Sequence, residues 1–333
     1  MTDVDGTLLT VDNLRVAFGG RAAPSLTALD GVDLHLGAGE VLGLVGETGC
    51  GKTMTGLSIL RLLPPGARIT GGRIGFEGEE LLGRPERAMR RIRGRRIAMI
   101  FQNPASAFNP VFTIGWQIER VMREHQALGR RARRERLLAV LSEVGLADAE
   151  RIAGAYPHQL SGGMLQRAMI AMALVNRPSL VIADEPTTAL DATIAAQILT
   201  LLRRLQAEHG FGVLFITHNL TAVRQICDRV AVLYAGRVIE TAPTDELFTE
   251  AQHPYTRGLL ASVPSLAARV QRLAAIDGTV PADPGAVTGC AFAPRCPVAF
   301  DACREQRPPV VSISPSHGRA CLLAGAGHAN ARA

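Results

Sequence analysis

The sequence predicts an α/β fold in which a mainly parallel sheet is buried between helices. Three short apolar segments have the composition of strands covered on both faces: 41–45, 180–183 and 213–216. Apolar residues at helical spacing follow the first strand, and Asp191 and Gly210 bound a predicted helix at 192–209. With 333 residues, 47% of them hydrophobic, the chain is long enough for one large domain and a smaller one.

Residues 46–53, GETGCGKT, predict a phosphate-binding loop, or P-loop. They fit the pattern G-x-x-x-x-G-K-[ST] and precede helical spacing that runs from Met54 to Leu63 and stops at Pro64-Pro65-Gly66. The glycines let backbone N–H groups surround phosphates, the helix N-terminus adds partial positive charge, and the Thr53 hydroxyl can ligate Mg²⁺. We expect the whole loop to bind a nucleotide: Gly46, Glu47, Thr48, Gly49, Cys50, Gly51, Lys52, Thr53 and Met54.

Lys52, inside this loop, is the only lysine of the chain. The other 35 of the 36 basic residues are arginine. An ammonium is a compact charge on a flexible stem that reaches phosphates beneath a tight loop, whereas a guanidinium is a wide planar fork. We therefore expect a steric requirement for lysine at this position and a catalytic role in stabilising phosphate charge.

Two carboxylates, Asp184 and Glu185, follow the strand 180–183 directly. The carboxyl ends of parallel strands meet at one edge of a sheet, where ligands bind. At that edge one carboxylate can hold Mg²⁺, usually through water, and its neighbour can polarise an attacking water.

Six motifs stand in a fixed order between residue 11 and about residue 245. Besides the P-loop and Asp184-Glu185, they are Gln102 in FQNPASAFNP, LSGGMLQ at 160–166, TTALD at 187–191 and His218 in ITHNL. In this order they resemble the nucleotide-binding subunit of ABC transporters. The resemblance implies a P-loop NTPase (RecA-like) ABC ATPase core at 1–245, with a helical subdomain at about 103–165, that binds ATP and Mg²⁺ and hydrolyses ATP.

The resemblance also implies roles for single residues. Glu185 would be the general base, and His218 would contact the γ-phosphate and steady Glu185. Gln102 would sense Mg²⁺ and the γ-phosphate and signal to the membrane partner. Thr53 and Asp184 would be the other residues at the Mg²⁺ ion.

The LSGG segment would complete the ATP site of a second subunit. Ser161 stands at an N-cap position, and Gly162 and Gly163 expose backbone N–H groups at the positive end of the following helix. In ABC proteins this turn faces the γ-phosphate held by the opposing subunit, with Asp191 at the subunit contact. One chain would therefore make half of each of two sites, and Phe18 would stack on the adenine in its own half.

After about residue 245 the sequence becomes rich in proline and prone to loops. HPYTRGLLASVP at 253–264 and the later GCAFAPRCP resemble the tail of the oligopeptide/dipeptide subfamily of these ATPases, which also includes nickel and glutathione importers. We therefore expect a C-terminal extension of the oligopeptide/dipeptide-transporter type at 246–333.

Four cysteines lie within 32 residues of this extension: Cys290, Cys296, Cys303 and Cys321. Their spacing lacks the C-x₂₋₄-C pairs typical of structural zinc, whereas a [4Fe–4S] cluster accepts irregularly spaced thiolates, and Cys296-Pro297 is similar to the Cys-Pro of ferredoxins. Three alternatives remain: a [4Fe–4S] cluster, a zinc ion, or four unliganded thiols. His317 is a further candidate ligand.

The leading hypothesis is the ATPase subunit of an importer for di- or oligopeptides or similar small solutes. A second ABC ATPase subunit, with a sister subunit favoured over a second copy, would pair with it beneath two transmembrane permease subunits fed by an extracytoplasmic solute-binding protein. No apolar run is long enough for a membrane span, and the N-terminus does not resemble a signal peptide. We therefore expect a soluble protein, held by its permease at the cytoplasmic face of the cell membrane.

Two rival functions stay open. A non-transport ABC ATPase would act on nucleic acid or the ribosome, and a nickel or glutathione importer would carry other cargo. Arginines cluster at 84–96 and 130–136, but aromatic residues make up only 4% of the chain, too few for a base-stacking platform. We expect these arginines to form a solvated basic face near the nucleotide or an anionic membrane surface, and we expect no nucleic-acid partner.

Overall fold

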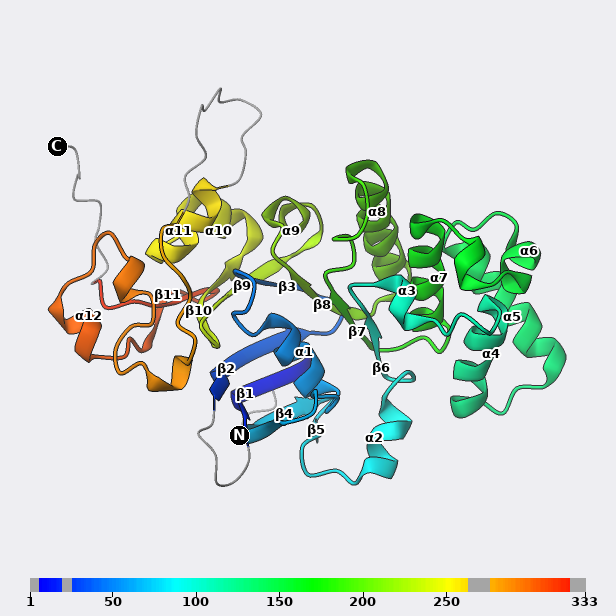
Figure 1. Cartoon of the computed structure of the whole chain (residues 1–333), viewed down its shortest axis with the longest axis horizontal. Coiled ribbons are helices and arrows are strands. Elements are labelled where there is room, and N and C mark those ends of the chain that lie inside the picture. Colours follow the sequence, from blue (N-terminus) through cyan, green and yellow to red (C-terminus); the bar gives the residue numbers. More distant parts are fainter. Residues whose placement is uncertain (1–5, 20–25, 263–275, 324–333) are drawn as a thin grey trace.

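Two β-sheets form the framework of the chain (Figure 1). The computed structural model describes residues 6–19, 26–262 and 276–323. The smaller sheet is antiparallel, and its strands, in spatial order, are β2 (Leu26–Gly37), β1 (Thr7–Phe18), β4 (Ala67–Phe76) and β5 (Glu79–Glu80). Its buried residues share a hydrophobic core with Leu44 and Ile216 of the larger sheet, so the two sheets pack as layers of one body.

The larger sheet has eight strands and carries the predicted parallel strands at its centre. Its spatial order is β11-β12-β10-β9-β3-β8-β7-β6. The five parallel strands are β9 (Arg229–Tyr234), β3 (Val41–Val45), β8 (Gly212–Thr217), β7 (Leu180–Asp184) and β6 (Ile97–Ile100). The three strands expected from the sequence are thus confirmed and adjacent. Their carboxyl ends meet at one edge of the sheet, where ligands bind in such folds.

Helix α1 (Lys52–Ile59) begins inside the P-loop but is shorter than the apolar spacing indicated. Helical spacing continues to Leu63, yet Arg61 adopts the left-handed conformation with φ 52°. The Leu62 N–H donates to the Leu57 carbonyl at 2.9 Å, which closes a Schellman-type C-cap. The expectation that this helix reaches Pro64-Pro65 was therefore wrong. Arg61 ends it by adopting the left-handed conformation, which is usually taken by glycine.

Between Asn103 and Val175 the chain is mainly helical, and this range contains the helical subdomain expected at about 103–165. The helices are α3 (Pro104–Ala107), α4 (Ile114–His125), α5 (Arg130–Glu143), α6 (Ala149–Gly154), the 3₁₀ turn η1 (Pro157–Gln159) and α7 (Gly162–Leu174). They gather at the end of the molecule opposite the C-terminal extension (Figure 1). In α5, Leu137 and Leu141 are four residues apart and fully buried, so this face of the helix forms part of the core of this region.

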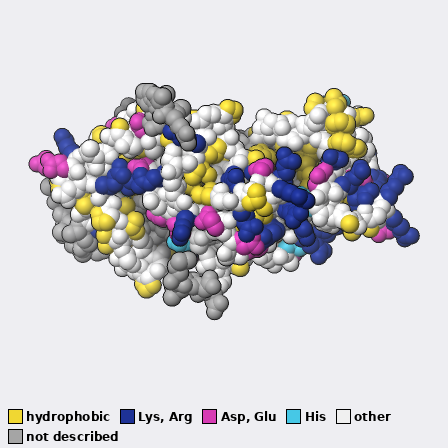
Figure 2. All heavy atoms as spheres, turned by 90° about the horizontal axis from the view of Figure 1, so that it is seen from below, with side chains coloured by type: hydrophobic (Ala, Val, Ile, Leu, Met, Phe, Trp, Pro, Cys, Tyr) yellow, Lys and Arg dark blue, Asp and Glu magenta, His cyan; other side chains and the backbone are white. Residues whose placement is uncertain are grey.

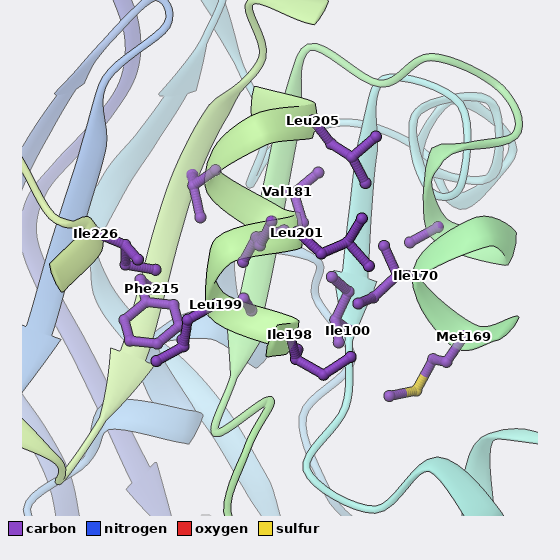
Figure 3. Packing of buried hydrophobic residues seen from close by; sticks show 14 of the residues in the cluster. Ile100, Met169, Ile170, Val181, Ile198, Leu199, Leu201, Leu205, Phe215 and Ile226 are labelled. Carbon is purple, nitrogen blue, oxygen red and sulfur yellow. The ribbon is translucent and has the colours of Figure 1, made fainter. Parts of the chain in front are cut away.

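Helix α8 (Ala192–His209) has the bounds that the sequence predicts. The Asp191 carboxylate accepts a hydrogen bond from the Ile194 N–H at 3.0 Å, and Gly210 ends the helix with φ 71°. Figure 3 shows the buried face of α8, with Leu201 and Leu205 directed toward Ile170 of α7 and Leu199 directed toward Phe215 and Ile226. Ile226 ends α9 (Leu220–Ile226). One apolar core thus joins α7, α8, α9 and the parallel strands.

The C-terminal extension continues the larger sheet. Strand β10 (Arg237–Pro243) pairs with β12 (His317–Ala320), which pairs with the edge strand β11 (Val310–Ser314). Between them lie α10 (Thr244–Glu250), α11 (Pro254–Ala261), η2 (Pro284–Ala286), η3 (Ala293–Arg295) and α12 (Asp301–Glu305). The last two residues of the HPYTRGLLASVP segment lie outside the described residues.

The arginine clusters lie on one end of the surface. Figure 2 shows their side chains over the part that holds α2 (Glu86–Ile92), α4 and α5, interspersed with acidic groups. Six of them form ion pairs with glutamates: Arg84, Arg90, Arg93, Arg96, Arg131 and Arg134. These pairs interrupt the positive charge, as in a solvated mixed face. Within the described ranges, no helix combines the length and apolar character of a membrane span.

Candidate active site

The P-loop has a backbone path that requires glycine at two positions. Gly46 has φ 156°, and a Cβ there would lie 2.2 Å from the Leu233 carbonyl oxygen. Gly51 has φ 108°, and a Cβ there would lie 2.5 Å from the side chain of Leu29. A side chain at either position would collide with the strand or the side chain behind it. The loop is therefore wedged tightly between β3 and α1, beside β9.

Lys52 fills the inside of this loop. Its side chain is almost fully buried, and Nζ donates hydrogen bonds to the carbonyls of Gly46 at 2.7 Å and Glu47 at 2.9 Å. Cys50, also buried, lies with Sγ 3.8 Å from the same Nζ, and burial raises the pKa of its thiol. The ammonium thus sits where the turn encloses it, a space that suits a compact cation better than a planar fork.

Thr53 and Asp184 lie together at the start of α1 and the end of β7. The Thr53 hydroxyl donates to Oδ1 of Asp184 at 3.1 Å, and Asp184 as a whole is 5% exposed. Burial, followed by the repulsion from Glu185, raises the pKa of Asp184 against the hydrogen bond from Thr53. A hydroxyl beside a poorly solvated carboxylate is a donor set suited to Mg²⁺, which takes oxygen ligands.

The carboxylate of Glu185 is held by three other side chains. His218 Nδ1 lies 2.8 Å from Oε1, while Gln102 Nε2 and Thr188 Oγ1 donate to Oε2 at 3.0 and 2.9 Å. Burial pushes the pKa of Glu185 up, but the hydrogen bonds from His218 and Thr188 outweigh it, with the Lys52 charge adding to the fall, so the net pKa is lowered. Glu185 is therefore an oriented anion at neutral pH.

The backbone of Glu185 is strained. Its φ is 47°, in the left-handed region that glutamate seldom adopts, and its N–H donates to the Ile216 carbonyl of β8 at 2.8 Å. Such strain is concentrated at functional sites, where the surroundings hold it in place.

The four predicted catalytic residues lie together in the structure. His218 and Gln102 both contact Glu185, and Lys52 lies close enough for its charge to lower the pKa of Glu185.

The LSGG residues form a separate exposed turn. Ser161 caps α7, its Oγ accepting from the Met164 N–H at 3.3 Å, and Gly162 follows it as the first helical residue. A Cβ on Gly163 would lie 2.9 Å from Ile194 of α8. Asp191 is exposed nearby as the cap of that helix. Figure 1 shows α7 apart from α1, with the central strands between them. This turn therefore presents its free N–H groups outward rather than to the P-loop of the same chain.

Phe18 ends β1, where it pairs with Leu26 of β2 and Ala67 of β4. Its ring is half-buried. The role of Phe18 in stacking on the adenine stays a prediction.

Several contacts to the P-loop and to Glu185 were not predicted. Thr188 belongs to the TTALD motif, yet its bond to the carboxylate was missed. Tyr255 and Arg295 of the extension contact Glu47 of the loop across 208 and 248 residues of sequence. HPYTRGLL, which contains Tyr255, was noted only as a family signature. No local pattern marks Arg295, although its place beside Cys296 could have drawn notice.

The four cysteines of the extension line one pocket: Cys290, Cys296, Cys303 and Cys321. Burial raises the pKa values of Cys290 and Cys296. Among the described residues, these sulfur atoms supply no group of three within 4.8 Å of one another. The prediction that His317 is a candidate metal ligand was wrong. Its two ring nitrogens face carboxylates instead, that of Glu246 at 2.7 Å and that of Glu240 at 2.9 Å.

Two family models match the chain. One, described as ABC transporter, covers residues 29–188, and the other, described as oligopeptide/dipeptide transporter, C-terminal region, covers residues 239–303. The chain is 48% identical to a putative peptide import ATP-binding protein of Brucella ovis, over 95% of this chain and 96% of that protein. It is 45% identical to the oligopeptide transport ATP-binding protein AppD of Bacillus subtilis, over 95% and 97% of the two chains.

Solved structures agree with these matches. The dimeric, post-hydrolysis structure of the ATP-binding cassette MJ0796, bound to ADP and Pi, superposes with a TM-score of 0.63 at 28% identity, covering 71% of this chain and 99% of that chain. CbiO1 of Clostridium perfringens, part of the complex cbiONQ, superposes with a TM-score of 0.63 at 27% identity, covering 74% and 92%.

Proposed function

The chain belongs to the ABC transporter family of ATPases, with the C-terminal region of its oligopeptide/dipeptide branch, and from that premise we propose that it powers the import of di- or oligopeptides or similar small solutes. The observation that carries this proposal is the carboxylate of Glu185, held by His218 and Gln102 beside the P-loop lysine. That constellation suits ATP hydrolysis, and the names of the relatives supply the cargo class.

Each group at the site has a role in phosphoryl transfer to water. Glu185 accepts a hydrogen bond from the attacking water and aligns it with the γ-phosphate. His218 fixes the carboxylate and reaches the γ-phosphate, and Lys52 stabilises the phosphate charge. Since the pKa of Glu185 is lowered, its contribution is mainly orientation of the water by a fixed anion rather than strong basicity.

Thr53, Asp184 and Gln102 would hold Mg²⁺. The hydroxyl and carboxylate already lie 3.1 Å apart, and a divalent cation would favour the charged form of a carboxylate whose pKa burial raises. Bound Mg²⁺ supplies charge neutralisation at the β- and γ-phosphates. Gln102, through its bond to Glu185, links that site to the surface that follows it in the sequence.

A second ABC ATPase subunit completes each ATP site. Ser161, Gly162 and Gly163 form a capped helix N-terminus that suits an anion, and they lie on the surface at a distance from their own P-loop. The opposing subunit's γ-phosphate is that anion, with Asp191 at the contact. We favour a sister subunit over a second copy, although the MJ0796 cassette is itself dimeric.

The apolar surface after Gln102 docks the permease. Three large side chains are exposed in this stretch, Val111, Phe112 and Trp116, and the exposed Phe101 directly precedes Gln102. The rings of Phe112 and Trp116 stack with centroids 4.0 Å apart, and the Gln117 amide fixes the loop by donating to the Phe112 carbonyl at 3.0 Å. A short amphipathic helix of a membrane subunit fits such a surface. The chain thus lies peripherally on the cytoplasmic face, with a solute-binding protein on the other side.

The organisation into parts follows from these roles. Residues 1–245 form the nucleotide-binding domain, with the helical subdomain at about 103–165, and residues 246–333 form the extension. The pairing of β12 with β10 makes the extension a continuation of the core sheet rather than a tethered module.

The extension holds a [4Fe–4S] cluster on its four cysteines. All four cysteines line one pocket, and four thiolates are the donor set that a [4Fe–4S] cluster needs. A zinc ion with Zn–S bonds of about 2.3 Å would draw its thiolates to about 3.8 Å of one another. Among the described residues, no three of these sulfur atoms lie within 4.8 Å of one another, so a zinc ion would have to draw them together. Broad visible absorbance and four irons per chain after anaerobic purification are expected. A colourless protein with one zinc would support the zinc alternative, and a colourless protein without metal would support four unliganded thiols.

The import proposal is tested in vesicles that contain the assembled transporter. ATP turnover is measured while the binding protein is supplied with dipeptides, oligopeptides, glutathione or nickel in turn. Stimulation by peptides is expected. Stimulation by nickel or glutathione alone would mean that the chain serves a nickel or glutathione importer of the same subfamily. Turnover that responds instead to DNA or ribosomes would overturn the transport proposal.

A further inference from the structure

The carboxylate of Glu47, the second residue of the P-loop, is bound by Arg295 of the extension. Two guanidinium nitrogens donate to its two oxygens at 2.7 and 2.9 Å, a bidentate geometry. The Arg295 side chain is 5% exposed and that of Glu47 is 27% exposed. This ion pair is thus largely removed from solvent and joins residues 248 positions apart.

The main chain of Glu47 is held from the same side. Its N–H donates to the hydroxyl of Tyr255, in α11, at 2.9 Å. Its carbonyl accepts from Lys52 inside the loop at 2.9 Å. Every polar group of Glu47 therefore has a partner, and the extension supplies the partners of its side chain and its N–H.

The support behind these contacts is rigid. The rings of Tyr234, Tyr255 and Phe292 pack with centroids 4.6 to 5.4 Å apart, and the guanidinium of Arg295 lies over two of them. Nη2 of Arg295 also donates to the carbonyl of Ile276 at 3.1 Å, and Nε donates to the carbonyl of Asp277 at 2.8 Å. The guanidinium cannot move without breaking these bonds, so it presents a fixed fork to the loop.

We propose that Arg295 and Tyr255 are positioning residues for ATP, which hold the P-loop at Glu47 in its phosphate-binding conformation. The extension is then a structural part of the ATP site. A loop that is fixed before the nucleotide binds loses less conformational freedom on binding, so the two residues should increase the affinity for ATP. The groups that act on the attacking water, Glu185 and His218, lie elsewhere, directly after the ends of β7 and β8, so turnover at saturation is unaffected. This inference rests on the proposed ATPase function.

The test is a double-mutant cycle on the full chain. Arg295→Gln, Glu47→Gln and the double variant are compared with wild type for the Kd of MgATP and for KM and kcat of hydrolysis. If the two residues act as one pair, each variant raises Kd and KM by roughly tenfold, and the double variant raises them no further. The kcat stays within about twofold of wild type.

Further variants separate positioning from general stability. Glu47→Gln leaves the other bonds of Arg295 in place, and Tyr255→Phe removes only the hydroxyl at the Glu47 N–H, so both guard against an unfolded extension. Arg295→Lys keeps the charge without the fork and should recover affinity only in part. Arg304→Gln changes an exposed arginine of the same extension and is the matched control.

Each outcome decides the proposal. Wild-type affinity in both Arg295→Gln and Glu47→Gln, additive losses in the double variant, or an equal loss in Arg304→Gln would each overturn it while leaving the ATPase function intact. A wild-type chain that bound no MgATP would instead overturn the proposed function, and this inference with it.

Discussion

The Oε1 atom of Glu185 and Nδ1 of His218 lie 2.8 Å apart, although 33 residues separate them in sequence. The contact exists because β7 and β8 are neighbours and both end at the same edge of the sheet. The other oxygen of Glu185 accepts from Gln102 and Thr188, so both ends of the carboxylate are fixed before a nucleotide binds. Preorganisation of this kind places a negative charge where water must be aligned.

Glu185→Gln should bind MgATP with near wild-type affinity while ATP hydrolysis falls on the order of a hundredfold or more. The amide keeps the shape of the carboxylate but lacks the negative charge that aligns the water, and one of its two ends donates hydrogen bonds instead of accepting them. ATP should then remain bound and favour a closed dimer with the partner ATPase subunit. Single-turnover hydrolysis and nucleotide retention on the assembled complex measure both effects.

Glu208→Gln is the control for this prediction, since Glu208 is exposed on α8 and forms an ion pair with Arg204. It should hydrolyse ATP as the wild type does. Turnover of Glu185→Gln at the wild-type rate would mean that another group aligns the water.

Lys52→Arg should weaken MgATP binding by about tenfold or more although the charge is retained. The Lys52 ammonium lies inside the loop, 2.7 and 2.9 Å from two carbonyl oxygens, and the residue is 5% exposed. The wider guanidinium would have to displace the loop. Titration calorimetry checks the affinity. The opposite exchange at the exposed Arg90, to lysine, should leave it unchanged.

Local patterns sufficed wherever the determining residues are close in sequence. The helix Ala192–His209 was predicted with its bounds because an aspartate cap and a left-handed glycine stand directly at its ends. The P-loop was predicted because its glycines, lysine and flanking strand are contiguous. The early end of α1 was not, because Arg61 takes a conformation that sequence patterns reserve for glycine.

Long-range contacts explain most of what the sequence did not predict. Arg295 and Tyr255 reach Glu47 only because β12 joins the core sheet and folds the extension back over the loop. Likewise, His317 is one of eight histidines and was weighed as a metal ligand from its nearness to cysteines in sequence. Its two carboxylate partners lie 71 and 77 residues away, which no spacing rule indicates.

The stability of the chain should fall in mild acid through His253. Burial, and then the charge of Arg319, lowers the pKa of His253 from 6.5 to about 3, and its Nδ1 accepts the Tyr255 N–H at 3.0 Å, which only the neutral ring can do. The unfolded chain therefore binds the proton more readily. The stabilisation is complete above pH 6.5 and is lost progressively as the pH falls toward 3, at about 1.4 kcal/mol per unit.

His253→Asn isolates this contribution, because asparagine also caps a helix but does not titrate. Denaturant unfolding at pH 7 and pH 5 should show a loss about 2 kcal/mol smaller in the variant than in the wild type. His35→Asn, at an exposed position of β2, is the control. Equal losses in the wild type and His253→Asn would assign the acid sensitivity to other groups.

Ser161→Asp should abolish ATP turnover in the assembled complex while the isolated chain still binds MgATP. Aspartate caps a helix as well as serine does, so α7 keeps the bond that Ser161 Oγ now accepts from the Met164 N–H. The added carboxylate, however, would face the γ-phosphate of the opposing subunit and repel it. Ser161→Asn keeps the cap without the charge and should retain most of the turnover. If the aspartate and asparagine variants turned over ATP equally, the LSGG turn would not meet a phosphate, because only a nearby anion distinguishes the two side chains.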